Sequence, residues 1–474
     1  MRLFLIWTGM DLARELIPRL RAQSHEVAYW VGLKGGGEEK FPEVIFHDHY
    51  DAWDGKPAPA LASEKFDPPS ADLIGRFHKT ESLILTMMNK HFDWMGSDER
   101  KHLYYHMLSY WSGALKKLKP DAVIFSYIPH TVYDYLLFEL ARSENIKTVM
   151  LQNTMPITGR MLIYDDFREG SAELKNQMEK NKNRKFSPED LTGNTREFYE
   201  SRIKTGQDAA PQYLKESRKR FSFFNRVLLK SNAVFTSFKN GDFAERMFTR
   251  AIKLLKENIR EEYNRVSTEP DFSQKYIYAP LHYQPECTSS PLGDVFVDQI
   301  LMIKTLSASL PEGWIIYVKE HPSQWFKRGL NYGSVRYRGY YDQLSRIQNV
   351  RLVPVTADSH LLTQSAKAVA TISGVAGSEA ILRGKPAVVF GYPWYRDCRG
   401  VFKVDGADAC RDALKKIENG FSVNGQSVIN FLKSVDEVGI RAYIDMYGQR
   451  TSGVNEDESV SNISGAILKS LEKN

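Results

Sequence analysis

The sequence predicts an α/β fold with two Rossmann-like domains and a cleft between them, together with inserted and C-terminal helices. Two observations support this prediction. Short apolar runs that suit buried strands alternate with amphipathic helical patterns, which is typical of a parallel sheet covered on both faces. This alternation occurs twice, once in each half of a chain of 474 residues, a length that suits two domains.

The first series of elements begins at the N-terminus. Its predicted strands are residues 2–7, 27–31, 122–126 and 147–152. Its predicted helices are residues 11–22, 77–92, 98–118 and 131–143. Between these elements, residues 35–75 are rich in Gly, Pro and acidic side chains, and we expect them to form loops.

Residues 168–272 have a different character, because charged side chains dominate them and their periodic parts are helical. We expect helices appended to the first domain. Within this stretch, residues 213–230 mix Lys and Arg with Phe, Val and Leu. Such a segment can lie on a membrane surface, here the inner membrane, or it can be an ordinary solvated helix that packs on the core.

A second series of elements starts near residue 275. Its predicted strands are residues 276–280, 314–319, 350–353, 368–372 and 387–390. Its helices are predicted within residues 293–310 and at 339–347, 359–365 and 377–383, and two last helices at 428–446 and 458–472 end the chain. We therefore divide the chain into a first domain at 1–272, a second domain at 273–427 and C-terminal helices at 428–474.

Composition and charge restrict the function. The chain is 42% hydrophobic and 26% charged, and Lys and Arg exceed Asp and Glu by six, which is too weakly basic for a typical nucleic-acid-binding protein. It suits an anionic small substrate or a loose contact with an acidic membrane face. The three cysteines, Cys287, Cys398 and Cys410, lack CxxC spacing, so we expect free thiols in a reducing compartment.

The N-terminal apolar run, Leu3–Trp7, is predicted to be a buried strand. Asp11, Arg14 and Glu15 follow almost at once, whereas a signal peptide or a membrane helix needs a longer apolar segment. We therefore expect a cytoplasmic protein.

A polar loop at residues 280–286 follows the first strand of the second series. Pro280 and Pro285 stiffen this loop, while Gln284 and Glu286 offer hydrogen-bonding groups. Since ligands of open α/β sheets bind at the carboxyl ends of the strands, we take Gln284 and Glu286 as candidate ligand-binding residues.

A second polar loop contains Lys319, Glu320 and His321, followed by Pro322. A cation or an imidazolium at this strand end would neutralise the charge that builds on a departing phosphate. A single His is more often structural, but the run Lys-Glu-His-Pro at a strand end favours a functional role.

A third loop runs from the strand at 368–372 through a glycine turn into a helix. Backbone N–H groups and the helix dipole at such a start suit a phosphate. The spacing matches neither a P-loop nor a GxGxxG fingerprint, so ATP and NAD chemistry gain no support. The candidate ligand-binding residues of this loop are Ser373, Gly374, Gly377, Ser378 and Glu379.

Two tandem Rossmann-like domains with a cleft are typical of the GT-B type of glycosyltransferase, although epimerases and some kinases share this architecture. Several motifs between residues 275 and 400 separate these classes. They are Tyr276–Gly293, Asp298-Gln299, Leu310–Trp314, Tyr317–Pro322, Thr371–Ile381, Gly384–Pro386, Phe390-Gly391 and Trp394-Tyr395. In these motifs the sequence resembles the capsular polysaccharide synthesis proteins, a family that includes the Kdo transferases.

The resemblance implies a GT-B-like enzyme that transfers an acidic, Kdo-like sugar from a CMP-activated donor to a glycan or lipid-linked glycan. The element His321-Pro322 is similar to one that contacts the CMP phosphate in sialyltransferase-like enzymes. By motif, the resemblance assigns donor contacts to Gln284, Glu286, Lys319, His321, Ser373, Gly374, Ser378 and Glu379. It places the donor in the second domain and the acceptor in the first.

The resemblance does not locate the catalytic carboxylate, which chemistry requires. Glycosyl transfer passes through an oxocarbenium-like state, so a carboxylate of the first domain must face the anomeric carbon. The candidates are Asp165 and Asp166, followed by Asp134, and each of them suits a helix cap or a surface charge equally well. Arg160 could hold a sugar carboxylate or pair with a neighbouring Asp.

We expect that no metal is needed, because Lys319 and His321 can neutralise the phosphate charge. His321 is therefore also a candidate catalytic residue. Other readings stay open: a UDP-sugar-dependent transferase or epimerase of the same architecture, and a non-catalytic partner in polysaccharide assembly or export. No nucleic acid partner is expected.

Overall fold

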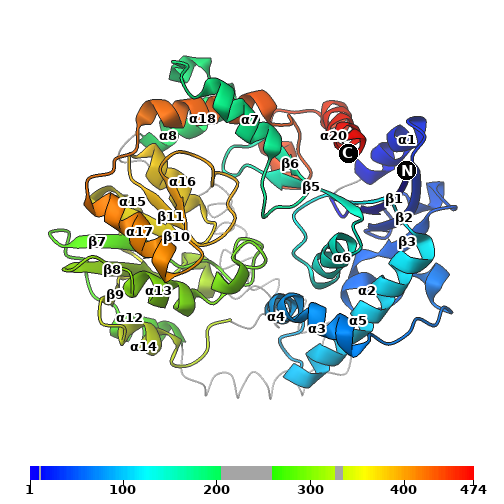
Figure 1. Ribbon diagram of the computed structural model, residues 1–474, viewed down its shortest axis with the longest axis horizontal. Coiled ribbons are helices and arrows are strands. Elements are labelled where there is room, and N and C mark those ends of the chain that lie inside the picture. Colours follow the sequence, from blue (N-terminus) through cyan, green and yellow to red (C-terminus); the bar gives the residue numbers. More distant parts are fainter. Residues whose placement is uncertain (10–11, 204–258, 326–334, 474) are drawn as a thin grey trace, which may run out of the picture.

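A computed structural model describes residues 1–9, 12–203, 259–325 and 335–473, and it contains two six-stranded sheets (Figure 1). In Figure 1 the first domain lies at the right in blue and cyan, and the second lies at the left in green to orange. Both sheets have the Rossmann strand order 3-2-1-4-5-6 when their strands are numbered in sequence. The predicted fold class, α/β with two Rossmann-like domains, is confirmed.

The first sheet has the order β3-β2-β1-β4-β5-β6. Its parallel strands are β1 (Arg2–Ile6), β2 (Glu26–Gly32), β3 (Ile45–Asp48), β4 (Ala122–Phe125) and β5 (Lys147–Asn153). The edge strand β6 (Met161–Tyr164) is antiparallel to β5. Since side chains alternate along a strand, Phe4 and Ile6 enter one core, while Leu3 and Leu5 enter another on the opposite face.

Helices cover both faces of this sheet. On the face of Phe4 lie α4 (His78–Met87), α5 (Ser97–Leu118) and α6 (Val132–Ser143), with the short α2 (His49–Trp53) and α3 (Ala71–Arg76) beside them. On the other face lie α1 (Leu12–Ala22) and the C-terminal helix α20 (Glu456–Glu472). Figure 1 shows α20 beside α1, close to both chain ends.

The second sheet has the order β12-β11-β10-β7-β8-β9 and is parallel throughout. Its strands are β7 (Lys275–Pro280), β8 (Trp314–Lys319), β9 (Val350–Leu352), β10 (Ala368–Thr371), β11 (Ala387–Val389) and β12 (Val401–Lys403). One face carries α12 (Ile259–Val266), α13 (Gln299–Ser307), α14 (Tyr340–Ser345) and α17 (Ala407–Glu418). The other face carries α15 (Ser359–Ser365) and α16 (Val375–Leu382).

The end of the chain joins the two domains. Helix α18 (Gly425–Val438) packs against α7 (Ala172–Asn181), and α8 (Gly193–Ile203) packs against α16. The chain then returns to the first sheet, where Met161 and Ile440 exchange two backbone hydrogen bonds of 3.0 and 2.8 Å. After α19 (Met446–Thr451), helix α20 covers the first sheet.

Several elements differ from the expectation. Strand β3 lies in the segment expected to be loops, and β6, β12 and α17 were not predicted. Strands of three or four residues carry too little periodicity to stand out, and they form because a neighbouring strand offers hydrogen bonds. The boundary at 272/273 stays a prediction, although Tyr263 of α12 packs into the core of the second domain.

Residues 213–230, the predicted basic-aromatic segment, lie outside the described residues, and membrane contact stays a prediction. Among the described helices, none is long and apolar enough to cross a membrane.

Direct contacts join the two domains. Lys79 of α4 forms a 2.7 Å ion pair with Asp294, which lies on the connection from β7 to α13. The Trp394 indole donates to the carbonyl of Met155 over 2.9 Å, and Arg396 donates to the carbonyl of Phe167 over 2.6 Å. Loops at the carboxyl end of the second sheet therefore touch the first domain.

The packing of helix α20 against the first sheet can be tested. Ile467 is fully buried against the first sheet, so Ile467→Ala leaves a cavity, and we expect the free energy of unfolding to fall by about 2–5 kcal/mol. Urea unfolding followed by circular dichroism measures the change. Ser461→Ala, an exposed position of the same helix, is the control and should leave the midpoint unchanged. An equal midpoint for both variants would contradict this packing.

Candidate active site

The loop after β7 and the loop after β10 meet at the point where the strand order of the second sheet reverses. Such switch points are where open α/β sheets bind ligands. The Ser373 amide donates to Nε2 of His282 over 3.4 Å, and the Ser373 hydroxyl donates to the carbonyl of Thr288 over 2.6 Å. The structure thus brings the first and third predicted loops together.

The loop after β8 is joined to the same place by a buried ion pair. Arg336 donates from Nε and Nη2 to the two carboxylate oxygens of Glu320 over 2.8 and 3.2 Å, and both side chains are at most 1% exposed. Arg336 also donates to Oε1 of Gln284 over 2.5 Å and to the carbonyl of His282 over 3.1 Å. Tyr341 donates to Glu320 over 2.6 Å. One guanidinium therefore holds two of the three predicted loops.

Several residues predicted to bind a ligand are engaged within the protein. The Gln284 amide donates to the carbonyl of Val297 over 2.9 Å, in addition to its contact with Arg336. Glu320 is buried in its ion pair. Lys319 donates to the carbonyl of Ala357 and to the hydroxyl of Ser359 over 2.5 and 2.7 Å, and burial lowers its pKa to about 8. These side chains shape the loops from inside.

The third loop shows the same pattern. The Ser378 hydroxyl donates to the carbonyl of Val375 over 2.8 Å, inside α16. Glu379 pairs with Arg202 of α8 over 3.1 Å and with Arg383 over 3.5 Å, so it fastens α16 to α8.

The two glycines of the third loop allow close packing. A Cβ at Gly374 would lie 2.8 Å from Nε2 of His282. A Cβ at Gly377 would collide with the hydroxyl of Tyr395, which donates to the carbonyl of Gly374. Ser373 is likewise occupied, because its hydroxyl holds the first loop.

Two predicted residues, His321 and Glu286, keep side chains that are only partly buried. Nδ1 of His321 accepts from the Ser323 amide over 3.2 Å, which leaves the proton of the neutral ring on Nε2. Its own backbone amide donates to Glu320 over 2.7 Å, so the buried ion pair also orients this residue. The carboxylate of Glu286 has no ion-pair partner among the described residues.

His282 was not predicted. Burial, together with the nearby His321 and Arg336, lowers its pKa to about 3, so the ring is neutral. Its Nε2 lies 3.2 Å from the Thr371 hydroxyl and accepts from Ser373, which places the proton on Nδ1. The one sequence signal for a role of His282 is its position at a strand end, directly before Tyr283 and Gln284.

The first domain contributes Asp134, which lies in the first turn of α6, just beyond the carboxyl end of β4. Its Oδ1 accepts from the Thr131 amide over 2.7 Å as part of a capping box. Burial raises its pKa to about 7, despite several hydrogen bonds that favour the charged form. Burial, assisted by Glu286 and Asp134, raises the pKa of Cys287, so Asp134 faces the loop after β7.

Asp165 and Asp166 lie elsewhere. Both follow the antiparallel strand β6, so they lie at the edge of the first sheet where the parallel strands begin. The hydroxyl of Thr148, near the start of β5, donates to the carbonyl of Asp165 over 2.6 Å. Asp166 pairs with Arg142 over 2.7 Å. The structure does not bring these two carboxylates to the switch-point loops, because the last strand of this sheet runs in reverse.

Arg160 lies 3.6 Å from Asp436 of α18, which supports the alternative in which it pairs with an Asp. It also lines a small hollow between residues 153–160 and 442–448.

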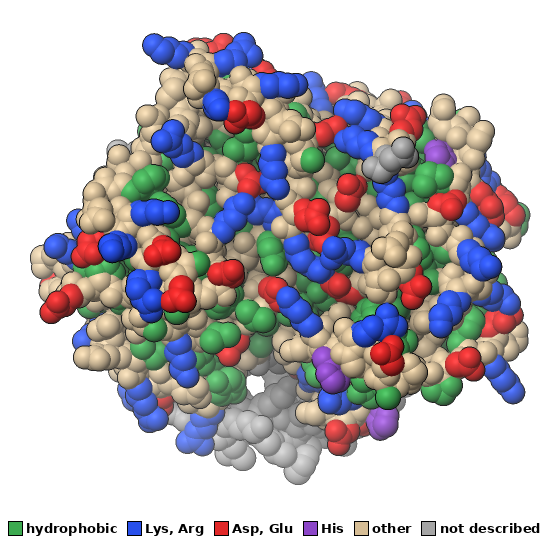
Figure 2. All heavy atoms as spheres, in the orientation of Figure 1, with side chains coloured by type: hydrophobic (Ala, Val, Ile, Leu, Met, Phe, Trp, Pro, Cys, Tyr) green, Lys and Arg blue, Asp and Glu red, His purple; other side chains and the backbone are tan. Residues whose placement is uncertain are grey.

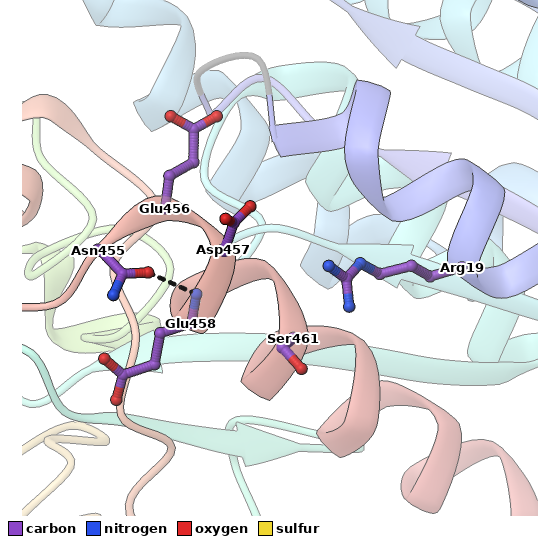
Figure 3. A pocket seen from close by; sticks show the side chains of 6 residues that line it. All are labelled: Arg19, Asn455, Glu456, Asp457, Glu458 and Ser461. Carbon is purple, nitrogen blue, oxygen red and sulfur yellow. Dashed lines mark hydrogen bonds between the residues drawn. The ribbon is translucent and has the colours of Figure 1, made fainter.

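A broader hollow lies between α1 and α20 (Figure 3). Arg19 faces the start of α20, where Glu456, Asp457 and Glu458 point in different directions. Neither hollow contains a residue to which the resemblance assigns a donor contact.

The molecular surface in Figure 2 has Lys and Arg interspersed with Asp and Glu on the face shown, without a continuous basic stripe there. Within the described ranges, no group of three or more His, Cys, Asp or Glu side chains could hold a metal ion. Independence from metal stays a prediction.

Comparison with known proteins identifies part of the chain. Residues 290–419 match the family of capsule polysaccharide biosynthesis proteins. This family-matched segment contains the elements from η5 (Asp294–Val297) to α17 and includes the loops of His321 and Ser373. The resemblance inferred from the motifs is confirmed there, whereas Gln284 and Glu286 precede the segment. No curated protein matches the chain.

Solved structures with similar architecture show low similarity. A beta Kdo 2,7 transferase, KpsC, from Thermosulfurimonas dismutans is 10% identical, with 79% of this chain and 91% of that chain covered and a TM-score of 0.30. A UDP-GlcNAc 2-epimerase from Methanocaldococcus jannaschii is 14% identical, with 90% and 97% covered and a TM-score of 0.24. Similarity at this level does not indicate an activity for this chain.

The ion pair of Arg336 and Glu320 leads to a prediction for stability. Arg336→Met strands the buried Glu320 charge, and we expect the free energy of unfolding to fall by about 3–5 kcal/mol. Guanidinium chloride unfolding measures it. Adding Glu320→Gln should recover part of the loss, because no unpaired charge then remains. Arg411→Met, which removes a pair with the exposed Asp408, is the matched control and should change little. Equal effects of Arg336→Met and the control would contradict the role of the pair.

Proposed function

We propose that this protein is a glycosyltransferase of bacterial surface or capsular polysaccharide synthesis, which moves a sugar from a nucleotide-activated donor to a glycan acceptor. One observation carries the proposal: Asp134, a carboxyl whose pKa burial raises to about 7, lies close enough to the loop after β7 for its charge to act on the Cys287 thiol. The family match of residues 290–419 supports the same conclusion, because these loops border or lie within that segment.

The reaction needs a carboxylate and a stabilised leaving group. The bond from the anomeric carbon to the donor phosphate breaks, and its electron pair goes to the phosphate. We assign His321 to donate from Nε2 to that phosphate, a hydrogen bond that strengthens as the negative charge grows. The new bond joins the anomeric carbon to the acceptor hydroxyl.

Asp134 then acts in one of two ways. As a base it takes the proton of the acceptor hydroxyl, and the anomeric configuration inverts. As a nucleophile it forms a glycosyl-enzyme that the acceptor hydroxyl resolves, and the configuration is retained. A carboxyl with a pKa near 7 suits the first role, because it holds its proton weakly at neutral pH yet accepts one readily.

The identity of the donor rests on the resemblance. We propose a CMP-activated acidic sugar of the Kdo type, on the basis of the motif His321-Pro322, with no metal required. A glycan or lipid-linked glycan acceptor, a cytoplasmic location and peripheral contact with the inner membrane belong to the same proposal. A UDP-sugar transferase, an epimerase and a non-catalytic partner are the outcomes against which it is tested.

Asp134→Asn should lower turnover by about 10²–10⁴-fold, because it removes the base or nucleophile while keeping the shape of the capping box. The measurement is release of CMP from CMP-Kdo by the purified protein. Asp165→Asn is the comparison, since Asp165 is the other carboxylate that the sequence suggested, and we expect a far smaller loss from it. A larger loss of turnover in Asp165→Asn than in Asp134→Asn would refute the assignment of Asp134.

The pH dependence follows from the same group. Since Asp134 must be deprotonated to act, and its folded-state pKa is raised to about 7, kcat/KM should rise with pH up to about 7 and level off above it. In parallel incubations, conversion of a UDP-sugar into another UDP-sugar would indicate an epimerase. A protein that binds CMP but releases none from CMP-Kdo would be a non-catalytic partner.

His321→Ala should weaken transition-state stabilisation at the phosphate. We expect kcat for CMP release to fall by about 10²–10³-fold, with a smaller change in CMP affinity. Stopped assays and calorimetric titration with CMP measure the two quantities. His102→Ala, on the exposed face of α5, is the matched control. Turnover equal to that of the control would remove His321 from the mechanism.

A further inference from the structure

Lys90 is a cation at the domain junction that pairs with no carboxylate among the described residues. It ends the short helix η3 (Met88–Lys90), which continues α4, and its side chain is partly buried. Its Nζ lies 5.8 Å from the ring centroid of Trp53. Among the described residues, no carboxylate lies within ion-pair distance of this ammonium. A contact with an aromatic ring stabilises a cation by only about 0.5–2 kcal/mol, which is less than the cost of removing an ammonium from water. A bound anion would offset that cost.

Groups from several elements face Lys90. His49 and Trp53 come from α2, with their rings 5.4 Å apart, and His130 comes from the loop after β4. The charge of Lys90 adds to burial in lowering the pKa of both histidines to about 4. The same charge opposes burial at the Cys287 thiol of the second domain. Lys90 therefore acts on both domains.

The carboxylates of the first domain beside this cluster have other roles. Asp48 caps α2 by accepting from the amides of Tyr50 and Asp51 over 2.9 and 3.2 Å. Asp54 contacts His91 over 3.0 Å and Lys56 over 3.2 Å. Asp134, which lies in the first turn of α6, is largely protonated below pH 7. None of these carboxylates lies within ion-pair distance of Lys90.

The two histidines are neutral and oriented. The Tyr133 hydroxyl lies 2.7 Å from Nδ1 of His49, and Nδ1 of His130 donates to the carbonyl of Ile128 over 2.7 Å. Because Nδ1 of His130 carries the proton of the neutral ring, its Nε2 carries a lone pair. The cluster thus combines an ammonium with two neutral imidazoles that can hydrogen-bond to hydroxyl groups.

We propose that Lys90, with His49 and His130, forms a subsite that binds the carboxylate of an acidic sugar. The ammonium pairs with the carboxylate, and the two imidazoles form hydrogen bonds with sugar hydroxyls. This inference rests on the proposed function, because it places the anionic part of a substrate beside Asp134. The carboxylate belongs to the donor sugar or to the terminal sugar of the acceptor, and the two sources give different binding results.

The test compares Lys90→Met, which keeps the aliphatic stem over Trp53, with Lys90→Arg, which restores the charge. Lys101→Met, on α5, controls for loss of a lysine whose partner, Glu81, is known. Calorimetric titration of the purified protein uses CMP, CMP-Kdo, free Kdo and the methyl ester of Kdo. We expect wild type to bind Kdo at least tenfold more tightly than its ester, and Lys90→Met to lose this preference while Lys90→Arg keeps most of it.

The donor and the acceptor are then separated. If the carboxylate is that of the donor, Lys90→Met weakens CMP-Kdo at least tenfold and leaves CMP unchanged. If it is that of the acceptor, CMP-Kdo keeps its affinity, and the KM for a Kdo-terminated acceptor rises at least tenfold. Either result supports the subsite.

Two results would overturn the inference: wild type that does not discriminate Kdo from its ester, or a preference that survives in Lys90→Met. If wild type still binds CMP and still releases CMP from CMP-Kdo in either case, the proposed function is unaffected. Absence of both in wild type would instead contradict the proposed function.

Discussion

The buried ion pair of Glu320 and Arg336 is the constraint on which the rest of the second-domain site depends. A buried carboxylate and guanidinium are stable only when hydrogen bonds replace the water that they lose, and here each makes several. Arg336 binds Glu320, Gln284 and the carbonyl of His282, while Glu320 also accepts from Tyr341 and from the amide of His321. The loops after β7 and β8 are thereby held in one arrangement.

A second constraint is steric and lies where the loops after β7 and β10 meet. Gly374 leaves room for the neutral imidazole of His282, and the Ser373 hydroxyl binds the carbonyl of Thr288. The loop positioned in this way carries Glu286 and Cys287 towards the first domain, where Asp134 and Lys90 lie. Asp134 and the loop after β7 thus become neighbours only through this packing, and the proposed chemistry depends on it.

The candidate site could be predicted in part. The loops at 280–286, 318–322 and 371–381 meet as the motifs indicated, because the carboxyl ends of parallel strands always share one edge. The roles within them were harder to predict. Gln284, Ser378 and Glu379 bind other parts of the protein, and a polar residue in a loop motif looks the same whether it faces a ligand or a buried partner.

The sequence by itself determined the two largely parallel sheets, most of their strands and the family resemblance, since these depend on local periodicity and contiguous motifs. Only the tertiary structure decided which carboxylate faces the second domain. Asp165 and Asp166 follow a strand whose reversed direction no local pattern reveals. Arg336, Lys90 and His49 come from segments far apart in the chain, and their surroundings exist only after folding, because burial and distant charges create them.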